Sequence, residues 1–598
     1  MCGVFGYFDR TGRSLPHDGL AAMSAALAHR GPDDRGMLAD EGLAIGNTRL
    51  SIIDIDGGHQ PFVSEDGDVA VVQNGEIYNY IELAQSLKGT PFECRTQCDT
   101  EVLLRLYQRD GIGFLSQLNG MFAIAIYDRR KRAVLLARDR VGVKPLFVHN
   151  DGVRITFASE IKSILAVTGP RDIDPEGLSQ YLTFNYVPPP YTMFQGIRHV
   201  EPGTWLELSR AGVKATRWWD LAAVDRVEQS EARWIDELMG LLDDAVRIRL
   251  RADVNFGAFL SGGIDSSTVT GLMARHMSKP VRTFSIGFHD PRYDETQFAE
   301  TAAKRFDTSH ISKRVDPQML DLWPMATFYC DQPHGDVSFL PTYKVSELAA
   351  EHVKMVLTGD GGDELFAGYD KYRDFFTPNV DELDQDAFRR SYYRNISLFD
   401  DRAKSTLYRR VASDAFDRVS ALFDEVKHWD RINQALYLDM QLLLPGNNLV
   451  KPDRMGMAVS LEARTPFLDY RVVELAFRMP GALKLKNGVT KWLLKQAVAP
   501  LIGTDLAYRS KQMFTVPVGD WFRSELRDYC ELHLGARSHF RRSDVLTDSG
   551  YQSFRKHCSG EQNNTRQIRA LIALDHWANA FQTAATPAAE ASARINFN

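Results

Sequence analysis

The chain has 598 residues, and 71 Lys+Arg against 78 Asp+Glu give a formal net charge of −7. This length predicts more than one domain, and fractions of 44% hydrophobic and 25% charged residues are typical of a globular protein, not of a disordered or fibrous one. The slight acidic excess argues against a globally basic protein, so we expect no nucleic-acid partner. No apolar run reaches about 18 residues, which predicts no membrane-spanning helix and no membrane partner.

Six cysteines lie scattered along the chain. They are too sparse for a disulfide framework, which favours a reducing compartment. The first residues do not resemble a secretory signal, because Asp9 and Arg10 end a short apolar stretch. Both observations predict a cytoplasmic protein. Cys94 and Cys98 have no second pair at zinc-binding spacing, so we expect two ordinary thiols there.

Short alternating or β-branched runs dominate the amino-terminal third of the chain. Examples are Val69–Gln73, Met121–Asp128 and Ala133–Ala137, with turn-forming residues between them. This pattern predicts stacked antiparallel sheets, interrupted by helices over residues 19–29 and 99–109.

Helical periodicity dominates from about residue 230, with isolated strands predicted at Val254–Leu260 and Val353–Leu357. Strands that alternate with helices predict a parallel α/β layer surrounded by further helices. We therefore predict domains at residues 1–212 and 213–598, with a margin of about ten residues at the boundary. The Ala-rich tail from about residue 582 is expected to be mobile.

Cys2 is the first candidate catalytic residue. It precedes Gly3, and removal of Met1 before so small a residue would place a thiol and a free α-amine on the same residue. An amine whose unperturbed pKa is about 8 can accept the thiol proton and activate the nucleophile without a histidine. The alternative is an ordinary thiol behind an initiator methionine.

Other candidates lie beside predicted strands. The Asn74 side-chain amide and the Gly75 backbone N–H can donate to a tetrahedral oxyanion. Arg49 could bind a carboxylate in a bidentate manner, and Asp99 could hold an ammonium group. Each has a structural alternative: a turn for Asn74-Gly75, a surface ion pair for Arg49 and a helix N-cap for Asp99.

Together these residues resemble the class II glutamine amidotransferase domain, an α+β N-terminal-nucleophile hydrolase with a four-layer αββα fold. The matching segments are Met1–Val4, His29–Asp33, Arg49–Ile52, Asn74–Asn79 and Ala137–Arg140. The resemblance implies that Cys2 attacks the glutamine side-chain amide, that Asn74 and Gly75 form the oxyanion hole, and that glutamate and ammonia are released. It also implies a glutamine-binding set of Arg49, Leu50, Ser51, Ile53, Asn74, Gly75, Glu76 and Asp99.

A phosphate-binding loop is predicted after the strand Val254–Leu260. Its sequence is Ser261-Gly262-Gly263-Ile264-Asp265-Ser266-Ser267, and a helix follows. Adjacent glycines let backbone N–H groups converge on an anion, serine hydroxyls can donate to phosphate oxygens, and Asp265 can hold Mg²⁺. No Walker pattern occurs, and the alternative is a tight strand-to-helix turn with N-capping serines.

A second, acidic loop follows the strand Val353–Leu357. In Thr358-Gly359-Asp360-Gly361-Gly362-Asp363-Glu364, three carboxylates at the carboxyl end of a strand suit a shared Mg²⁺ site opposite the phosphate loop. The alternative is a plain acidic turn.

Lys511 is the best candidate for offsetting the charge of ATP, although a lone Lys is commonly a solvent-exposed surface residue.

The first loop resembles the PP-loop of N-type ATP pyrophosphatases, which cleave ATP between the α and β phosphates. Residues 230 to about 525 resemble the asparagine synthetase family, with further matches at 283–288, 453–455 and 461–469. This resemblance implies an α/β PP-loop domain with many helices, Mg²⁺ held by Asp265 and Asp363, and catalytic roles for Asp360 and Lys511. The implied ATP site is Leu260, Ser261, Gly262, Gly263, Asp265, Ser266, Ser267, Ile286, Thr358 and Gly359.

Two positions depart from the family pattern. Asp360 stands where some relatives have Glu, which shortens its reach by one methylene and leaves its acid/base role in doubt. Met513 replaces a Gly that is common near the lysine of this family, so the loop around Lys511 could close differently.

The resemblance implies synthesis of L-asparagine, L-glutamate, AMP and diphosphate from L-aspartate, L-glutamine, ATP and water, through an aspartyl-adenylate. A sheltered path between the domains would carry ammonia in its neutral form. One alternative keeps this chemistry and changes the acceptor to a sugar uronate or a natural-product acid. A second is a non-catalytic sensor, against which the intact Cys2, Asp265 and Asp363 argue. The oligomeric state stays open, with a homodimer as one option.

Overall fold

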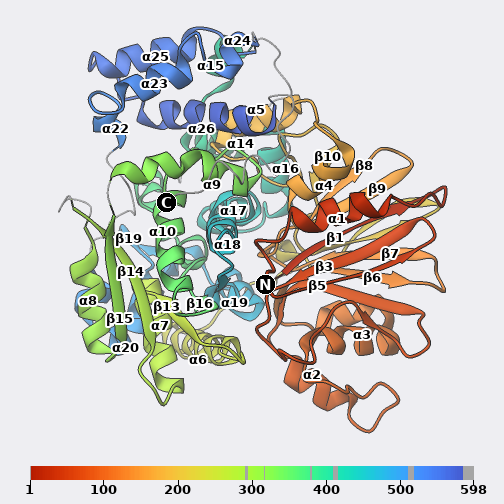
Figure 1. Cartoon of the computed structure of the whole chain (residues 1–598). Helices are drawn as coiled ribbons and strands as arrows, with labels where there is room; N and C mark the ends of the chain where they lie inside the picture. Colours follow the sequence, from red (N-terminus) through yellow and green to blue (C-terminus); the bar gives the residue numbers. More distant parts are fainter. Residues whose placement is uncertain are drawn as a thin grey trace.

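The computed structural model describes residues 2–289, 294–315, 317–377, 380, 382–408, 415–509, 518–543 and 545–582. In the amino-terminal part of the chain, two six-stranded antiparallel sheets face each other (Figure 1). The first sheet has the order β10-β8-β9-β1-β3-β2, and the second has the order β12-β11-β7-β6-β5-β4. The strands are β1 (Cys2–Asp9), β2 (Asp34–Asp40), β3 (Leu43–Arg49), β4 (Phe62–Val63), β5 (Val69–Ile77), β6 (Gly120–Asp128), β7 (Ala133–Arg138), β8 (Phe147–Asn150), β9 (Arg154–Ala158), β10 (Ile197–His199), β11 (Thr204–Ser209) and β12 (Gly212–Arg217).

Helices cover the outer faces of both sheets. Every residue of β1 is buried, because alternate side chains pack against the other sheet and against the helices. Val4 and Phe8 belong to the core between the sheets, whereas Phe5 and Tyr7 pack with the helix side. The covering helices are α1 (His17–Ala25) and α4 (Ile161–Thr168) on one side and α2 (Tyr80–Leu87) and α3 (Asp99–Asp110) on the other. The predicted αββα layering is therefore confirmed.

Residue 212, where the domain boundary was predicted, lies within the second sheet. That residue begins β12, which pairs with β11 through Arg217, so the second sheet continues past it. The helix predicted over residues 19–29 is observed as α1, which ends at Ala25.

A five-stranded parallel sheet forms the centre of the carboxy-terminal part, in the order β15-β14-β13-β16-β17. Its strands are β13 (Phe256–Phe259), β14 (Arg282–Phe288), β15 (Ser309–Val315), β16 (Met355–Leu357) and β17 (Glu462–Arg464). The predicted strands at 254–260 and 353–357 correspond to β13 and β16. Helices pack around this sheet, as the alternating pattern predicted (Figure 1): α6 (Glu231–Arg249), α7 (Ile264–His276), α8 (Thr296–Arg305), α10 (Phe339–Ala350) and α20 (Trp492–Ile502).

Further helices and a short hairpin complete this part. The hairpin consists of β18 (Leu485–Lys486) and β19 (Val489–Thr490). Helix α5 (Pro175–Phe184) belongs to the amino-terminal part, and the other helices of the carboxy-terminal part are α9 (Trp323–Cys330), α11 (Gly362–Phe366), α12 (Asp370–Phe375), α14 (Gln385–Ile396), α15 (Asp401–Leu407), α16 (Ala415–Glu425), α17 (Arg431–Gln441), α18 (Val450–Met457), α19 (Tyr470–Arg478), α21 (Thr504–Ala507), α22 (Val518–Trp521), α23 (Arg527–Leu534), α24 (His539–Arg542), α25 (Ser549–Cys558) and α26 (Thr565–Phe581).

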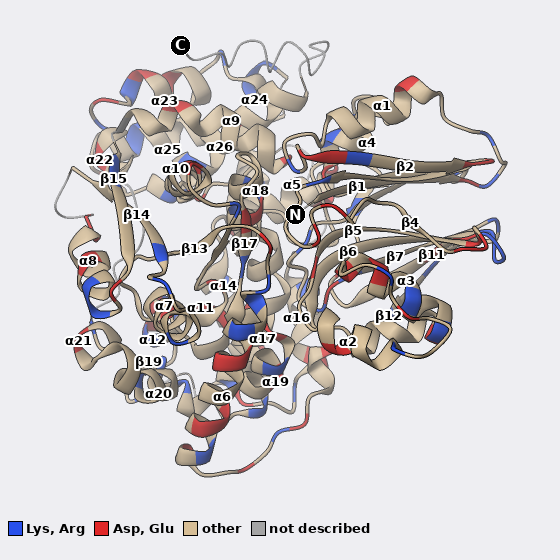
Figure 2. Ribbon diagram, turned by 60° about the horizontal axis from the view of Figure 1, so that its bottom comes forward, with Lys and Arg blue, Asp and Glu red and all other residues tan. Residues whose placement is uncertain are grey.

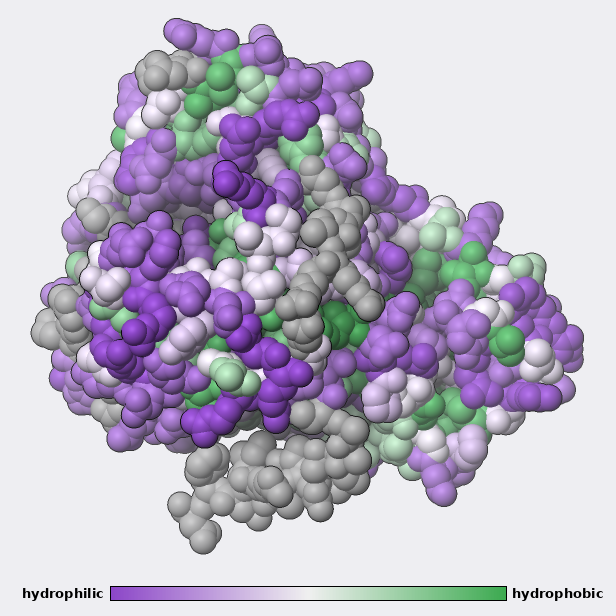
Figure 3. All heavy atoms as spheres, turned by 90° about the horizontal axis from the view of Figure 1, so that it is seen from above, coloured by the Kyte–Doolittle hydropathy of each residue, from purple (hydrophilic) through white to green (hydrophobic). Residues whose placement is uncertain are grey.

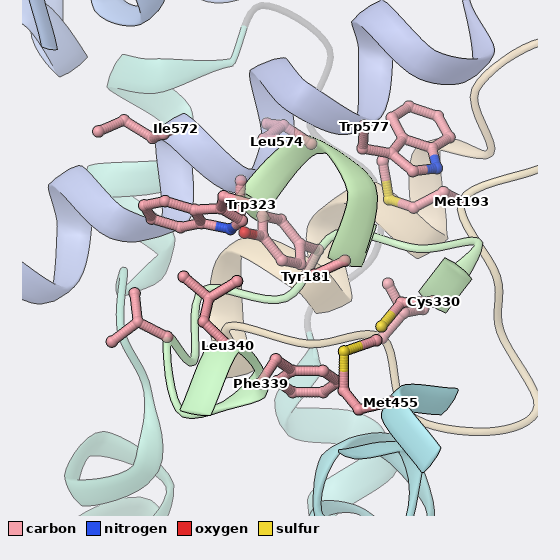
Figure 4. Packing of buried hydrophobic residues seen from close by; sticks show 14 of the residues in the cluster. Tyr181, Met193, Trp323, Cys330, Phe339, Leu340, Met455, Ile572, Leu574 and Trp577 are labelled. Carbon is pink, nitrogen blue, oxygen red and sulfur yellow. The ribbon is translucent and has the colours of Figure 1, made fainter. Parts of the chain in front are cut away.

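A continuous apolar core joins the two parts. Figure 4 shows Tyr181 of α5 among side chains of α9, α10 and α26, including Trp323, Leu340 and Leu574. The Tyr181 hydroxyl also donates a hydrogen bond of 2.6 Å to the Ala570 carbonyl. The close packing of such a core fixes how the two parts sit against each other.

Charged residues are distributed over the whole molecule. Lys/Arg segments and Asp/Glu segments are interspersed along the ribbon in Figure 2. In Figure 3, hydrophilic residues cover most of the visible face and hydrophobic residues are scattered. Within the described ranges, no helix combines the length and the apolar character needed to span a bilayer.

Candidate functional site

Cys2 begins β1, next to Arg49 at the end of β3. Its backbone N–H donates to Asn74 Oδ1 at 3.1 Å, and its carbonyl accepts from Arg30 Nε at 3.1 Å. Burial raises the pKa of the Cys2 thiol, while hydrogen bonds from the Leu50 backbone and the Asn47 side chain act in the opposite direction. The thiol is thus held in a fixed, dry position at the edge between the two sheets.

Asn74 and Gly75 lie within β5, beside Cys2. Asn74 is fully buried, and its Nδ2 donates to Ser159 Oγ at 3.3 Å, a length at which the donor is only weakly engaged. Gly75 has φ +146°, and a Cβ there would lie 1.9 Å from the Met121 carbonyl oxygen. A side chain would collide with the backbone of the neighbouring strand, so only glycine fits this position.

The predicted glutamine-binding residues of the 49–53 segment form a compact loop. Arg49 Nη1 donates to the Ile55 carbonyl, and its Nη2 donates to the carbonyls of Ile53 and Asp54, at 2.7–3.1 Å. Ser51 N–H donates to Asp33 Oδ2 at 2.8 Å. These bonds use three of the five N–H donors of Arg49, which leaves two outside these contacts.

Glu76 and Asp99 are buried carboxylates on the other side of the thiol. Asp99 Oδ2 accepts from the Gln73 side chain and from the Ile77 backbone, both at 2.9 Å. Asp99 is the first residue of α3, and Cys98 is the N-cap, so the alternative of an Asp99 N-cap is wrong. Burial raises the pKa of both carboxyls, and for Glu76 the charge of Glu462 adds to this effect.

The predicted phosphate loop links β13 to α7. Ser261 Oγ accepts from the Gly263 backbone N–H at 3.3 Å and lies 3.1 Å from Ser266 Oγ. The hydroxyls therefore point into the turn, at the N-terminus of a helix, where anions are stabilised. Leu260 and Ile286 are buried at the ends of the neighbouring strands β13 and β14.

The acidic loop lies against the phosphate loop. A Cβ on Gly359 would come within 2.7 Å of the Asp265 Cβ, so glycine is required for this close approach. Thr358 Oγ1 donates to Asp360 Oδ2 at 2.6 Å, and burial raises the pKa of Asp360. Glu364 instead accepts from the Tyr369 hydroxyl at 2.6 Å. The expectation that three carboxylates share one site is therefore wrong for Glu364, whose oxygen is engaged by Tyr369.

Lys491 joins the two loops, although no motif in the sequence marks it. Its ammonium lies 2.5 Å from Asp265 Oδ2 and 2.6 Å from Asp363 Oδ1, and its side chain is buried. The two carboxylates raise its pKa against the effect of burial, so it stays protonated. From the sequence alone, a lone Lys is ordinarily expected at the surface.

The same carboxylate pair fits the chemistry of Mg²⁺. Asp265 and Asp363 converge from two loops on the ammonium group of Lys491. Mg²⁺ in proteins typically takes one or two carboxylates together with phosphate oxygens. Among the described residues, no group of three or more His, Cys, Asp or Glu residues suits a metal ion. Any metal there would thus depend on ligands from the nucleotide.

Some predicted residues lie outside the described residues. These are Met1, Lys511, Met513 and the tail beyond residue 582. Arg509 is the last described residue before Lys511. Its Nε donates to the Gly262 carbonyl at 2.9 Å, and its Nη2 pairs with Glu295.

Comparison with known proteins decides the family. The asparagine synthase family matches residues 237–579, and the glutamine amidotransferase domain family matches residues 1–219. Asparagine synthetase (glutamine-hydrolyzing) 1 of Bacillus subtilis is 31% identical, over 96% of this chain and 96% of its own length. The chain belongs to the asparagine synthase family. A putative asparagine synthetase (glutamine-hydrolyzing) of Mycobacterium tuberculosis is 32% identical over 96% of this chain and 97% of its own length.

Another relative carries a different name. Amidase chry2 of Gibberella zeae is 28% identical over 87% of this chain and 90% of its own length.

Membership of the asparagine synthase family makes the protein an ATP-dependent ligase that hydrolyses glutamine. It also confirms the expected order of an N-terminal-nucleophile amidotransferase domain followed by a PP-loop domain.

Proposed function

We propose that this family member is a glutamine-dependent asparagine synthetase, which converts ATP, L-aspartate, L-glutamine and water into AMP, diphosphate, L-asparagine and L-glutamate. The observation that carries the proposal is the presence of two polar centres in one chain. One surrounds Cys2 and Asn74, and the other joins Asp265, Asp363 and Lys491. Relatives named asparagine synthetase match along nearly the whole chain.

In the first centre, Cys2 Sγ attacks the side-chain amide carbon of glutamine. With Met1 removed, the α-amine of Cys2 takes up the thiol proton and later delivers a proton to the departing ammonia. Asn74 Oδ1, 3.1 Å from the Cys2 nitrogen, orients this amine. Asn74 Nδ2 and the Gly75 N–H donate to the oxyanion, while water then releases glutamate from the thioester.

The remaining residues of this centre hold the glutamine. The two N–H donors left on Arg49 bind the α-carboxylate, and the buried carboxylates of Glu76 and Asp99 receive the α-ammonium. Leu50, Ser51 and Ile53 shape this loop through their backbones: the Leu50 backbone contacts the thiol, the Ser51 N–H donates to Asp33, and the Ile53 carbonyl accepts from Arg49.

In the second centre, the Ser261–Ser267 loop binds the phosphates of ATP. A carboxylate oxygen of the acceptor attacks the α-phosphorus, diphosphate leaves, and an acyl-adenylate forms. Lys491, with Lys511, offsets the charge that develops on the phosphates. Ammonia then attacks the acyl carbon of the adenylate, and AMP leaves. Asp360 is held by Thr358 and lies beside this loop, where its raised pKa suits uptake of a proton from the attacking ammonia.

Mg²⁺, held by Asp265 and Asp363, would neutralise phosphate charge when bound with ATP. In that arrangement Lys491 keeps both carboxylates ionised and facing the nucleotide.

The interface between the centres is buried and suits transfer of neutral ammonia. Arg30 is fully buried and donates to Asp453 of α18 at 2.9 and 3.0 Å, and to the Cys2 carbonyl at 3.1 Å. Exclusion of water keeps ammonia unprotonated and nucleophilic.

The acceptor acid distinguishes this proposal from its main alternative. The relatives named amidase favour the same chemistry on another carboxylate, such as a sugar uronate or a natural-product acid. Purified protein with ATP and glutamine should release AMP and diphosphate in equal amounts with asparagine only when L-aspartate is present. Product formation with another acid, and none with aspartate, would support the alternative.

A further inference from the structure

The glutamine centre receives the buried side chain of Arg464 from the ATP-binding domain. Arg464 ends β17, the last strand in the order of the parallel sheet, and is completely buried. Its Nη2 lies 3.4 Å from Oε2 of Glu76, in the strand β5 that also carries Asn74 and Gly75. This ion pair therefore crosses from one domain to the other.

The direction of this guanidinium is fixed by its other contacts. Nε donates to Glu462 Oε1 at 2.6 Å, and Nη1 donates to the carbonyls of Arg249 and Arg251 at 2.8 and 2.7 Å. Because the guanidinium is planar and rigid, holding Nε and Nη1 also sets the position of Nη2. The remaining nitrogen is the one that meets Glu76.

Glu76 needs such a cation. Burial and the charges of Glu462 and Asp99 raise the pKa of the Glu76 carboxyl well above its usual range, and the charge of Arg464 is the largest influence that lowers it. A buried carboxylate without a cation would take up a proton and lose its attraction for an ammonium group.

We propose that Arg464 is a positioning residue for the amide donor: supplied by the ATP-binding domain, its fixed guanidinium holds the Glu76 side chain in place for the donor's α-ammonium group. This proposal rests on the proposed function, in which Glu76 binds glutamine. It adds that the glutamine centre is incomplete until the two domains are in contact.

The backbone of the same residue reaches the ATP centre. The Thr358 N–H donates to the Arg464 carbonyl at 2.9 Å, and Leu357 pairs with Arg464 in the sheet. Thr358 begins the acidic loop that carries Asp360 and Asp363. One residue thus fixes the start of that loop through its backbone and contacts the Glu76 carboxylate through its side chain.

The test compares R464Q with the wild-type protein in glutamine hydrolysis without ATP. We expect the KM for glutamine to rise about tenfold or more, the value of one charge-assisted contact, while kcat changes less than about threefold. Synthesis with ammonia should persist, because the backbone link to Thr358 is unchanged. R389Q is the matched control, since Arg389 pairs with Asp424 at 2.7 Å, between α14 and α16; its KM should be that of wild type.

Two readouts separate positioning from general support of the fold. In the double variant R464Q/E76Q, the KM should stay within about twofold of E76Q alone, because both changes remove one interaction. In R464Q the acidic limb of kcat/KM should move to higher pH, since Glu76 loses the charge that favours its ionised form. The proposal is overturned if the increases in KM caused by R464Q and E76Q multiply in the double variant. It is also overturned if the acidic limb of the kcat/KM profile does not move in R464Q.

Further outcomes are equally decisive. An unchanged KM in R464Q, or loss of ammonia-dependent synthesis in the folded variant, overturns the proposal and leaves the proposed function intact. If R464Q does not fold, R464K takes its place, with a smaller rise in KM expected and an unchanged KM contradicting the proposal. Absence of glutamine hydrolysis by the wild-type protein would contradict the proposed function as well. The acceptor acid has no bearing on this assay.

Discussion

Lys491 Nζ lies 2.5 Å from Asp265 Oδ2, although 226 residues separate the two in the chain. The contact is possible because Lys491 precedes α20 and its backbone N–H donates to the Phe366 carbonyl at 3.1 Å, next to the acidic loop. A single buried ammonium thereby holds together the two loops expected to bind ATP. Its position gives the first prediction.

Replacing Lys491 by Met should abolish adenylate formation. Loss of the cation leaves Asp265 and Asp363 to repel each other and removes charge compensation for the phosphates, which should lower kcat for AMP release about 100-fold or more. Glutamine hydrolysis should stay near wild type. The control is Lys486→Met, because Lys486 pairs with Glu231 at a partly exposed position of the nearby hairpin. Equal losses in both variants would contradict a specific role for Lys491.

Gly75→Ala should inactivate glutamine hydrolysis. The new Cβ would overlap the Met121 carbonyl, and φ +146° is strained for any residue with a side chain. Displacement of the Gly75 N–H from the oxyanion should cost about 100-fold in kcat, with ammonia-dependent synthesis retained.

Gly89→Ala provides the comparison for this variant. Gly89 also has a positive φ, of +73°, but no atom lies within 4 Å of its Cβ position. This change should cost about 1 kcal/mol of stability and leave hydrolysis unaltered. Full hydrolysis by Gly75→Ala would rule out the oxyanion role of its backbone.

Lys484 should make the stability depend on pH. Its side chain is completely buried, with Nζ 4.4 Å from the centre of the Phe477 ring, and burial lowers its pKa to about 7. Between that pKa and the pKa of an unfolded lysine, about 10.4, the unfolded chain binds more protons than the native one, so this group makes stability rise with pH. Below about pH 7 both states are protonated and the full cost of the buried charge is present.

Lys484→Met should therefore raise the free energy of unfolding at pH 6 on the order of 3 kcal/mol, and by less at pH 9. Thermal unfolding at the two pH values measures this difference. Lys486→Met, on the adjacent strand, should show no such pH dependence. A gain of equal size at both pH values would show that Lys484 is not the titrating group.

The sequence predicted the layers and the loops but not the contacts between them. Alternating or β-branched runs such as Val69–Gln73 and Met121–Asp128 identified the strands β5 and β6, because a strand places alternate side chains on opposite faces. The Ser261–Ser267 and Thr358–Glu364 segments lie where expected because glycines and strand ends are local signals. Periodicity carries no information on which distant residues meet, so the pair of Arg30 and Asp453 had no local signal.

Single residues were missed for the same reason. Asn47 supports the thiol from an inner position of β3, and Arg464 enters the glutamine centre from another domain. Glu364 belonged to a motif whose carboxylates were expected to act together, yet Tyr369 and Asn448 engage it instead. Each of these depends on tertiary contacts that only the folded chain defines.

The central claim is that Cys2 releases ammonia at one centre for use at the other. The most direct measurement is the rate of amide product formation by Cys2→Ala with glutamine and, separately, with ammonium salts at about pH 8, near the pKa of an α-amine. We predict that glutamine-dependent formation is lost while ammonia-dependent formation, with AMP as the nucleotide product, continues near the wild-type rate. Retained use of glutamine, or loss of both reactions in a folded protein, would contradict it.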